Sequence, residues 1–90
     1  MKAVTIDKVL SIINSNIENI DLSYEQVEAD LTELGMDSIS FIRIIVDVEE
    51  NFECEIPDSK LLITELNSVK KIYEELQLLY YETESNSAHE

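Results

Sequence analysis

A chain of 90 residues with 20 acidic and 6 basic side chains has a formal net charge of −14, which excludes most partners that are themselves strongly anionic. Nucleic acids and anionic membrane surfaces are bound through Lys and Arg, so neither is an expected partner. One glycine and one proline are too few for the turns of an all-β fold, and this length allows a single domain with a modest core. The composition predicts one small all-α domain.

The cysteine content and the lengths of the apolar runs indicate in which cellular compartment the protein is expected. Cys54 is the only cysteine, which excludes an intramolecular disulfide, and we interpret it as a small buried or half-buried apolar residue. We find no signal-peptide pattern and no apolar run of about 20 residues that would predict a membrane span. We therefore expect a cytoplasmic monomer.

The first helix is expected to begin after Thr5, a good capping residue. Apolar residues then recur at spacings of three and four, while polar residues fill the opposite side of the helical wheel. The apolar positions are Ile6, Val9, Leu10, Ile13, Ile17 and, at the uncertain end of the helix, Ile20.

A long connection is expected over residues 21–36. Ser23 and Gln26 match the spacing of a local capping box, which predicts a short turn near residues 24–29. Leu31 and Leu34, three residues apart, are expected to insert into the core and hold this loop down.

The second helix is expected over residues 38–52. Gly35 breaks the preceding segment, and Asp37 and Ser38 are residue types that favour a helix N-terminus. A phosphate bonded to the Ser38 hydroxyl would be stabilised there by the positive end of the helix. The expected core stripe consists of Phe41, Ile44, Ile45, Val48 and Phe52.

A second apolar strip lies out of phase with that stripe. We interpret Ile39 and Val46 as a partly exposed contact surface, because apolar residues surrounded by acids are typical of a docking patch. Ile42 either belongs to this strip or widens the core face. The predicted docking residues are Ile39, Arg43, Val46, Glu49 and Glu50.

Two shorter predictions complete the fold. Pro57 opens a short third segment over residues 58–63, and Asn67 or Ser68 caps a last helix. The apolar positions of that helix are Val69, Ile72, Tyr73, Leu76, Leu79 and Tyr80. The whole is predicted to be a small four-helix bundle of three longer helices and one short helix, with a long first loop. The folded domain is expected over residues 1–81, followed by a disordered acidic tail over residues 82–90.

The sequence offers no self-sufficient catalytic set. The only histidine, His89, falls in the expected tail, so a Ser–His pair with Ser38 is disfavoured. No calcium-loop pattern and no Cys/His cluster is present, so no metal site is expected. We predict that the chain is not an enzyme. On local evidence alone, an ordinary capped helix is the preferred interpretation of Asp37-Ser38, ahead of a modified serine.

Several motifs, taken in order and spacing, resemble the superfamily of acyl carrier and peptidyl carrier proteins over about residues 5–80. The matching stretches are LTELGMDSI at 31–39, EENF at 49–52, EIPD at 55–58 and NSV at 67–69. The resemblance implies a 4′-phosphopantetheine arm on the serine of the G-x-D-S motif, with a thiol that holds the cargo as a thioester. It assigns the attachment to Ser38, and to Asp37 a role in assisting the transferase.

The resemblance also implies partners and a pathway. A phosphopantetheinyl transferase, an acyl- or aminoacyl-loading enzyme and downstream biosynthetic enzymes with basic docking surfaces are expected. Ile39 after the serine and the cation Arg43 favour a free-standing carrier of a specialised pathway, nonribosomal peptide or polyketide-like. The alternatives are a fatty-acid acyl carrier protein and an unmodified acidic helical adaptor.

Overall fold

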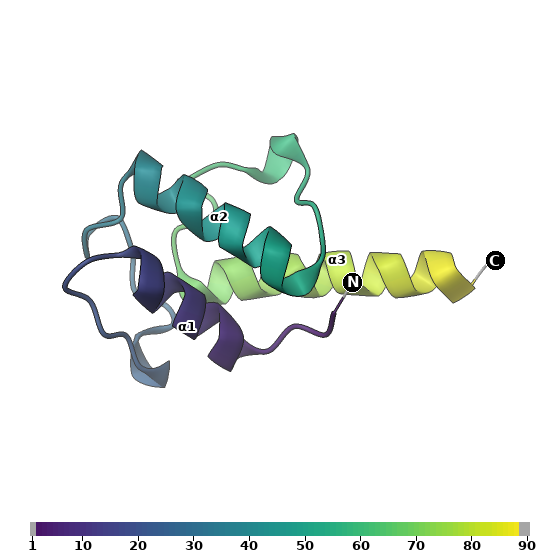
Figure 1. The fold of residues 1–90 in the computed structure, drawn as a ribbon, viewed down its shortest axis with the longest axis horizontal. Coiled ribbons are helices and arrows are strands. Elements are labelled where there is room, and N and C mark those ends of the chain that lie inside the picture. The colour runs from purple at the N-terminus through teal and green to yellow at the C-terminus, as the bar shows by residue number, and fades with distance from the viewer. Residues whose placement is uncertain (1, 89–90) are drawn as a thin grey trace.

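The computed structural model describes the backbone of residues 2–88 and the side chains of residues 2–82. His89 lies outside these residues, so the expectation that it belongs to a loose tail is not addressed. The helices are α1 (Ile6–Asn16), α2 (Ser38–Phe52) and α3 (Val69–Ala88), with single 3-10 turns η1 (Tyr24–Gln26) and η2 (Asp58–Lys60) (Figure 1). No strand occurs among the described residues, and the predicted all-α class is confirmed.

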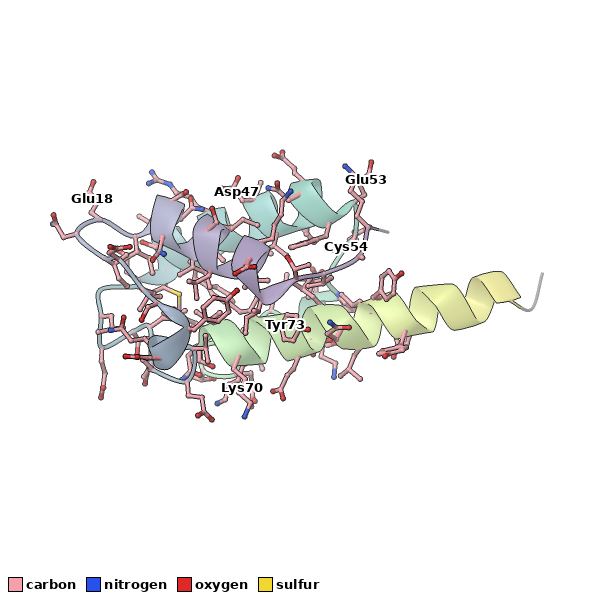
Figure 2. The ribbon with its side chains drawn as sticks, turned by 90° about the horizontal axis from the view of Figure 1, so that it is seen from below. Glu18, Asp47, Glu53, Cys54, Lys70 and Tyr73 are labelled. Carbon is pink, nitrogen blue, oxygen red and sulfur yellow. The ribbon has the colours of Figure 1, made fainter. Side chains whose placement is uncertain are left out.

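The core forms where α1 packs against both α2 and α3. α1 begins as predicted, because the hydroxyl oxygen of Thr5 accepts a hydrogen bond from the Lys8 N–H at 3.3 Å. Its buried face includes Ile12, which the predicted stripe omitted. α1 and α2 are also joined by a polar contact, in which Asn16 Nδ2 donates to Asp47 Oδ2 at 2.8 Å. Asp47 is labelled in Figure 2.

The loop between α1 and α2 contains one confirmed and one wrong prediction. The capping box of Ser23 and Gln26 is present, and Leu31 is buried. Leu34, however, is 39% exposed, and Met36 takes the expected core position. The cause is a tight turn in which Leu31 O accepts hydrogen bonds from the N–H groups of both Leu34 and Met36.

Gly35 makes that turn possible. Its φ of +115° lies in a region that residues with a Cβ rarely adopt and that glycine enters without a steric penalty. The reversal at Gly35 turns Met36 towards the core and delivers the chain to the start of α2.

The segment between α2 and α3 is less helical than predicted. Of the expected helix over residues 58–63, only η2 forms, as one 3-10 turn. Buried Ile56 and Leu66 anchor the two ends of the intervening residues 57–65, which are exposed or half-buried and which we call the wall. The wall runs beside α2 and forms part of the surface next to Ser38.

The last helix, α3, starts as expected but continues further than the apolar periodicity indicated. The Ser68 hydroxyl accepts a hydrogen bond from the Lys71 N–H at 3.1 Å, and Val69, Ile72 and Leu76 are buried. α3 extends to Ala88 and projects from the bundle (Figure 1). The division into a domain over residues 1–81 and a disordered tail over residues 82–90 stays a prediction.

Removing residues 82–90 should leave the melting temperature and the modification of the protein nearly unchanged. Among the side chains of residues 2–82, the last that is fully buried is Leu76, and Tyr81, the last residue before the cut, is 67% exposed. The sequence of residues 82–90 is polar and has no apolar periodicity, so the removed segment should add little stability. Thermal unfolding followed by circular dichroism tests this, and a loss of several degrees would show that the tail packs on the domain.

Candidate functional site

Ser38 is the first residue of α2, and its neighbours hold it in an exposed position. Asp37 is the N-cap, and its Oδ1 accepts hydrogen bonds from the Ser40 N–H at 2.8 Å and from the Ser40 hydroxyl at 2.9 Å. Among the described residues, no hydrogen bond involves the Ser38 hydroxyl. The cap thus occupies Ser40 and leaves Ser38 open to reaction.

The electrostatics at this helix end favour two anionic groups. The hydrogen bonds from the Ser40 N–H and then from the Ser40 hydroxyl hold the pKa of Asp37 below its usual value of 3.8, so Asp37 is ionised at neutral pH. The first N–H groups of a helix have no partners within the helix, and they carry the positive end of its dipole. A phosphodiester on Ser38 would lie at this positive end, so the local structure fits the phosphate of the expected arm.

The lowered pKa of Asp37 predicts an acid-sensitive contribution to stability. Because the pKa falls on folding, the contribution is present above the unfolded value near 3.8 and is lost as the pH drops through the lower folded value. Asp37→Asn should therefore show a smaller loss of melting temperature between pH 5 and pH 2 than the wild type. Asp30→Asn is the matched variant away from α2. Because the Thr32 hydroxyl chiefly lowers the pKa of Asp30, this variant should also lose less melting temperature in acid than the wild type. Equal pH dependence of the wild type and Asp37→Asn would contradict the prediction.

An apolar groove of about 480 Å³ opens beside Ser38, between α2 and the wall. It is lined by Ser38, Phe41, Ile42, Ile45, Val46, Glu49, Leu61, Leu62 and Ile63. The groove was not predicted from the sequence, although three consecutive apolar residues in a segment too short for a stable helix were a signal for it. Ser38 is its only hydroxyl-bearing residue and stands at one end.

The predicted docking residues fall into two groups. Ile39, Ile42 and Val46 are 63%, 61% and 45% exposed, so Ile42 joins the exposed strip instead of widening the core. Arg43 and Glu50 are exposed on the same helix. Glu49 differs, because it is half-buried and its Oε2 accepts a hydrogen bond from the Ile56 N–H at 2.8 Å.

Cys54 lies beyond the end of α2 opposite to Ser38 (Figure 2) and is half-buried, as the sequence suggested. Burial, followed by the charge of Glu49, raises the pKa of the Cys54 thiol above its ordinary value. The thiol therefore stays protonated at neutral pH and reacts slowly.

Two further properties concern metal binding and membrane insertion. Among the described side chains of residues 2–82, no group of three or more His, Cys, Asp or Glu is arranged to hold a metal ion. None of the described helices combines the length and the apolar character that crossing a membrane requires.

Comparison with known proteins gives one family. A family model described as a phosphopantetheine attachment site matches residues 7–76, a span that contains Ser38, the groove and the packed part of all three helices. No solved structure was found to match the chain. Domains of this family carry 4′-phosphopantetheine covalently on a serine and are carriers, not enzymes. The chain accordingly belongs to the phosphopantetheine-binding family, the superfamily of acyl and peptidyl carrier proteins.

Proposed function

We propose that Ser38 bears the phosphopantetheine arm and that the protein delivers acyl or aminoacyl groups, held as thioesters, to partner enzymes. The observation that carries this proposal is an exposed serine at the positive end of α2, at one end of an apolar groove, within the span matched by the family. In the attachment reaction a bond forms between Ser38 Oγ and the diphosphate phosphorus of coenzyme A that bears pantetheine. The bond from that phosphorus to the bridging oxygen breaks, the Ser38 proton passes to the transferase, and 3′,5′-ADP leaves.

Asp37 is proposed to assist that transfer. Its carboxylate is ionised, lies next to Ser38 in the chain, and both of its side-chain hydrogen bonds end on Oδ1. Oδ2 is then the oxygen suited to the transferase's divalent metal, since carboxylate oxygen is the ligand type that Mg²⁺ prefers.

The partners are proposed to dock on the exposed side of α2. Ile39, Ile42 and Val46 supply the apolar contact, and Arg43 and Glu50 border it. The net charge of −14 suits enzymes with basic docking surfaces, because opposite charges accelerate encounter while the contact itself stays weak enough for rapid exchange. This exchange is consistent with a cytoplasmic monomer that visits several enzymes.

The pathway is proposed to be a specialised one, nonribosomal peptide or polyketide-like. Ile39 after the serine and Arg43 on α2 support this choice through the resemblance described above. A fatty-acid carrier is the second candidate, favoured by the groove, whose lining is mostly aliphatic and suits a hydrocarbon chain. Measuring which acyl-CoA substrates and which amino-acid-loading enzymes charge the protein separates the two.

The attachment itself is tested with the wild-type protein, coenzyme A, magnesium and a broad-specificity phosphopantetheinyl transferase. The intact mass should rise by one phosphopantetheine, and peptide mapping should assign it to the peptide that contains Ser38. A wild type that stays unmodified while a control carrier is converted would overturn the proposal and favour an unmodified acidic adaptor.

A further inference from the structure

Glu49 connects two segments that form opposite sides of the groove. It lies about 16 Å further along α2 than Ser38, at the 1.5 Å rise per residue of a helix. Its Oε2 accepts the Ile56 N–H at 2.8 Å, and Ile56 is the buried residue that anchors the start of the wall. The neighbouring Glu50 is exposed and accepts no hydrogen bond from a described residue.

A second hollow, of about 520 Å³, begins where the groove ends. Val46, Glu49 and Leu61 line both spaces. Beyond them the second hollow adds Glu50, Cys54, Glu55, Ile56 and Asp58, so the lining changes there from mostly aliphatic to largely acidic. The hydrogen bond between Glu49 and Ile56 therefore lies at the boundary between the two spaces.

We propose that Glu49 is a positioning residue that ties the wall to α2 and closes the far end of the groove, so that it limits the length of the acyl chain shielded there. The inference rests on the proposed attachment of the arm to Ser38. Without the carboxylate, the wall loses its link to α2 at this point, and a longer chain can pass into the second hollow.

Three variants isolate the contact. Glu49→Ala removes the acceptor, Glu49→Gln keeps an acceptor oxygen without the charge, and Glu50→Ala removes an equal charge one residue away. In the unmodified protein, amide hydrogen exchange at Ile56 should be about tenfold faster in Glu49→Ala, the factor for losing a hydrogen bond to a charged group. Glu49→Gln should exchange faster than the wild type but more slowly than Glu49→Ala, because a neutral acceptor oxygen remains. Glu50→Ala should exchange at close to the wild-type rate. Unchanged exchange in Glu49→Ala would overturn the positioning role.

The effect on cargo is measured with acetyl, octanoyl and dodecanoyl groups, each introduced as acyl-phosphopantetheine from the acyl-CoA by the transferase. Shielding is measured as the factor by which hydroxylamine cleaves the thioester more slowly than it cleaves the acetyl form. Glu49→Ala should shield the dodecanoyl group better than the wild type does, by about fourfold for each further methylene that becomes buried. Glu49→Gln and Glu50→Ala should behave like the wild type.

The outcomes separate the two proposals. Equal dodecanoyl shielding in the wild type and Glu49→Ala overturns the length limit while leaving attachment at Ser38 intact. A wild type that the transferase cannot load overturns the proposed function and the length limit together, whereas the exchange rate of the Ile56 amide still decides whether Glu49 holds the wall.

Discussion

Ser38→Ala should take up no phosphopantetheine, whereas Ser40→Ala should be modified like the wild type. The two serines lie two residues apart in the first turn of α2, but only the Ser40 hydroxyl is engaged, donating to Asp37 Oδ1 at 2.9 Å. Ser38 is more exposed and is the serine that matches the G-x-D-S motif. Complete loss is expected because the arm needs an oxygen nucleophile at this position.

Intact mass after incubation with coenzyme A, magnesium and the transferase gives the result directly. Melting temperatures of both variants should stay close to that of the wild type, since neither side chain belongs to the core. Modification of Ser38→Ala, or its loss in Ser40→Ala, would move the attachment site to Ser40.

Ile39→Glu and Val46→Glu should keep the fold and weaken transfer. Both side chains are largely exposed, so the free energy of unfolding should change by no more than about 0.5 kcal/mol. A docking contact typically contributes about 1–2 kcal/mol or more, so transfer by the modifying and loading enzymes should fall about tenfold. Ile44→Glu is the contrasting variant, because Ile44 is fully buried and an unpaired charge there should cost several kcal/mol.

Urea unfolding and steady-state transfer rates together decide the role of this surface. Loss of stability in Ile39→Glu or Val46→Glu would place these residues in the core. If stability and transfer are both retained, recognition lies elsewhere, in the loop between α1 and α2 or in the wall.

The second helix shows how far the sequence alone can lead. Its bounds, Ser38 and Phe52, and its five buried residues follow from one capping signal and one uninterrupted apolar period. The loop before it was harder to predict. Whether Leu34 or Met36 enters the core depends on a turn that is set by the φ of Gly35. Ile12 was missed for a related reason, since α1 packs against two helices and its buried face is wider than a single stripe.

In the candidate site, too, features set by adjacent residues were predictable from the sequence, and features that depend on distant segments were not. The helix start at Asp37 and Ser38 was predicted from adjacent residues, because a helix cap is a local structure, whereas their expected roles in attachment came from the family resemblance. The groove depends on residues 61–63 lying against α2, which no local pattern specifies. Glu49 was predicted to face partners because its position on the helical wheel is polar, but its hydrogen bond to Ile56 depends on where the chain returns after the helix.

The way the wall is attached gives the molecule two separate stabilities. Its ends are anchored by buried Ile56 and Leu66, and between them only the half-buried Leu61 and Ile63 pack against the core, whereas the three helices share one continuous core. Local opening of such a segment costs less free energy than global unfolding, and it occurs far more often. Substitutions within the wall should thus change how long a thioester survives without changing how much folded protein a cell maintains, while substitutions in the α1 interface should do the reverse.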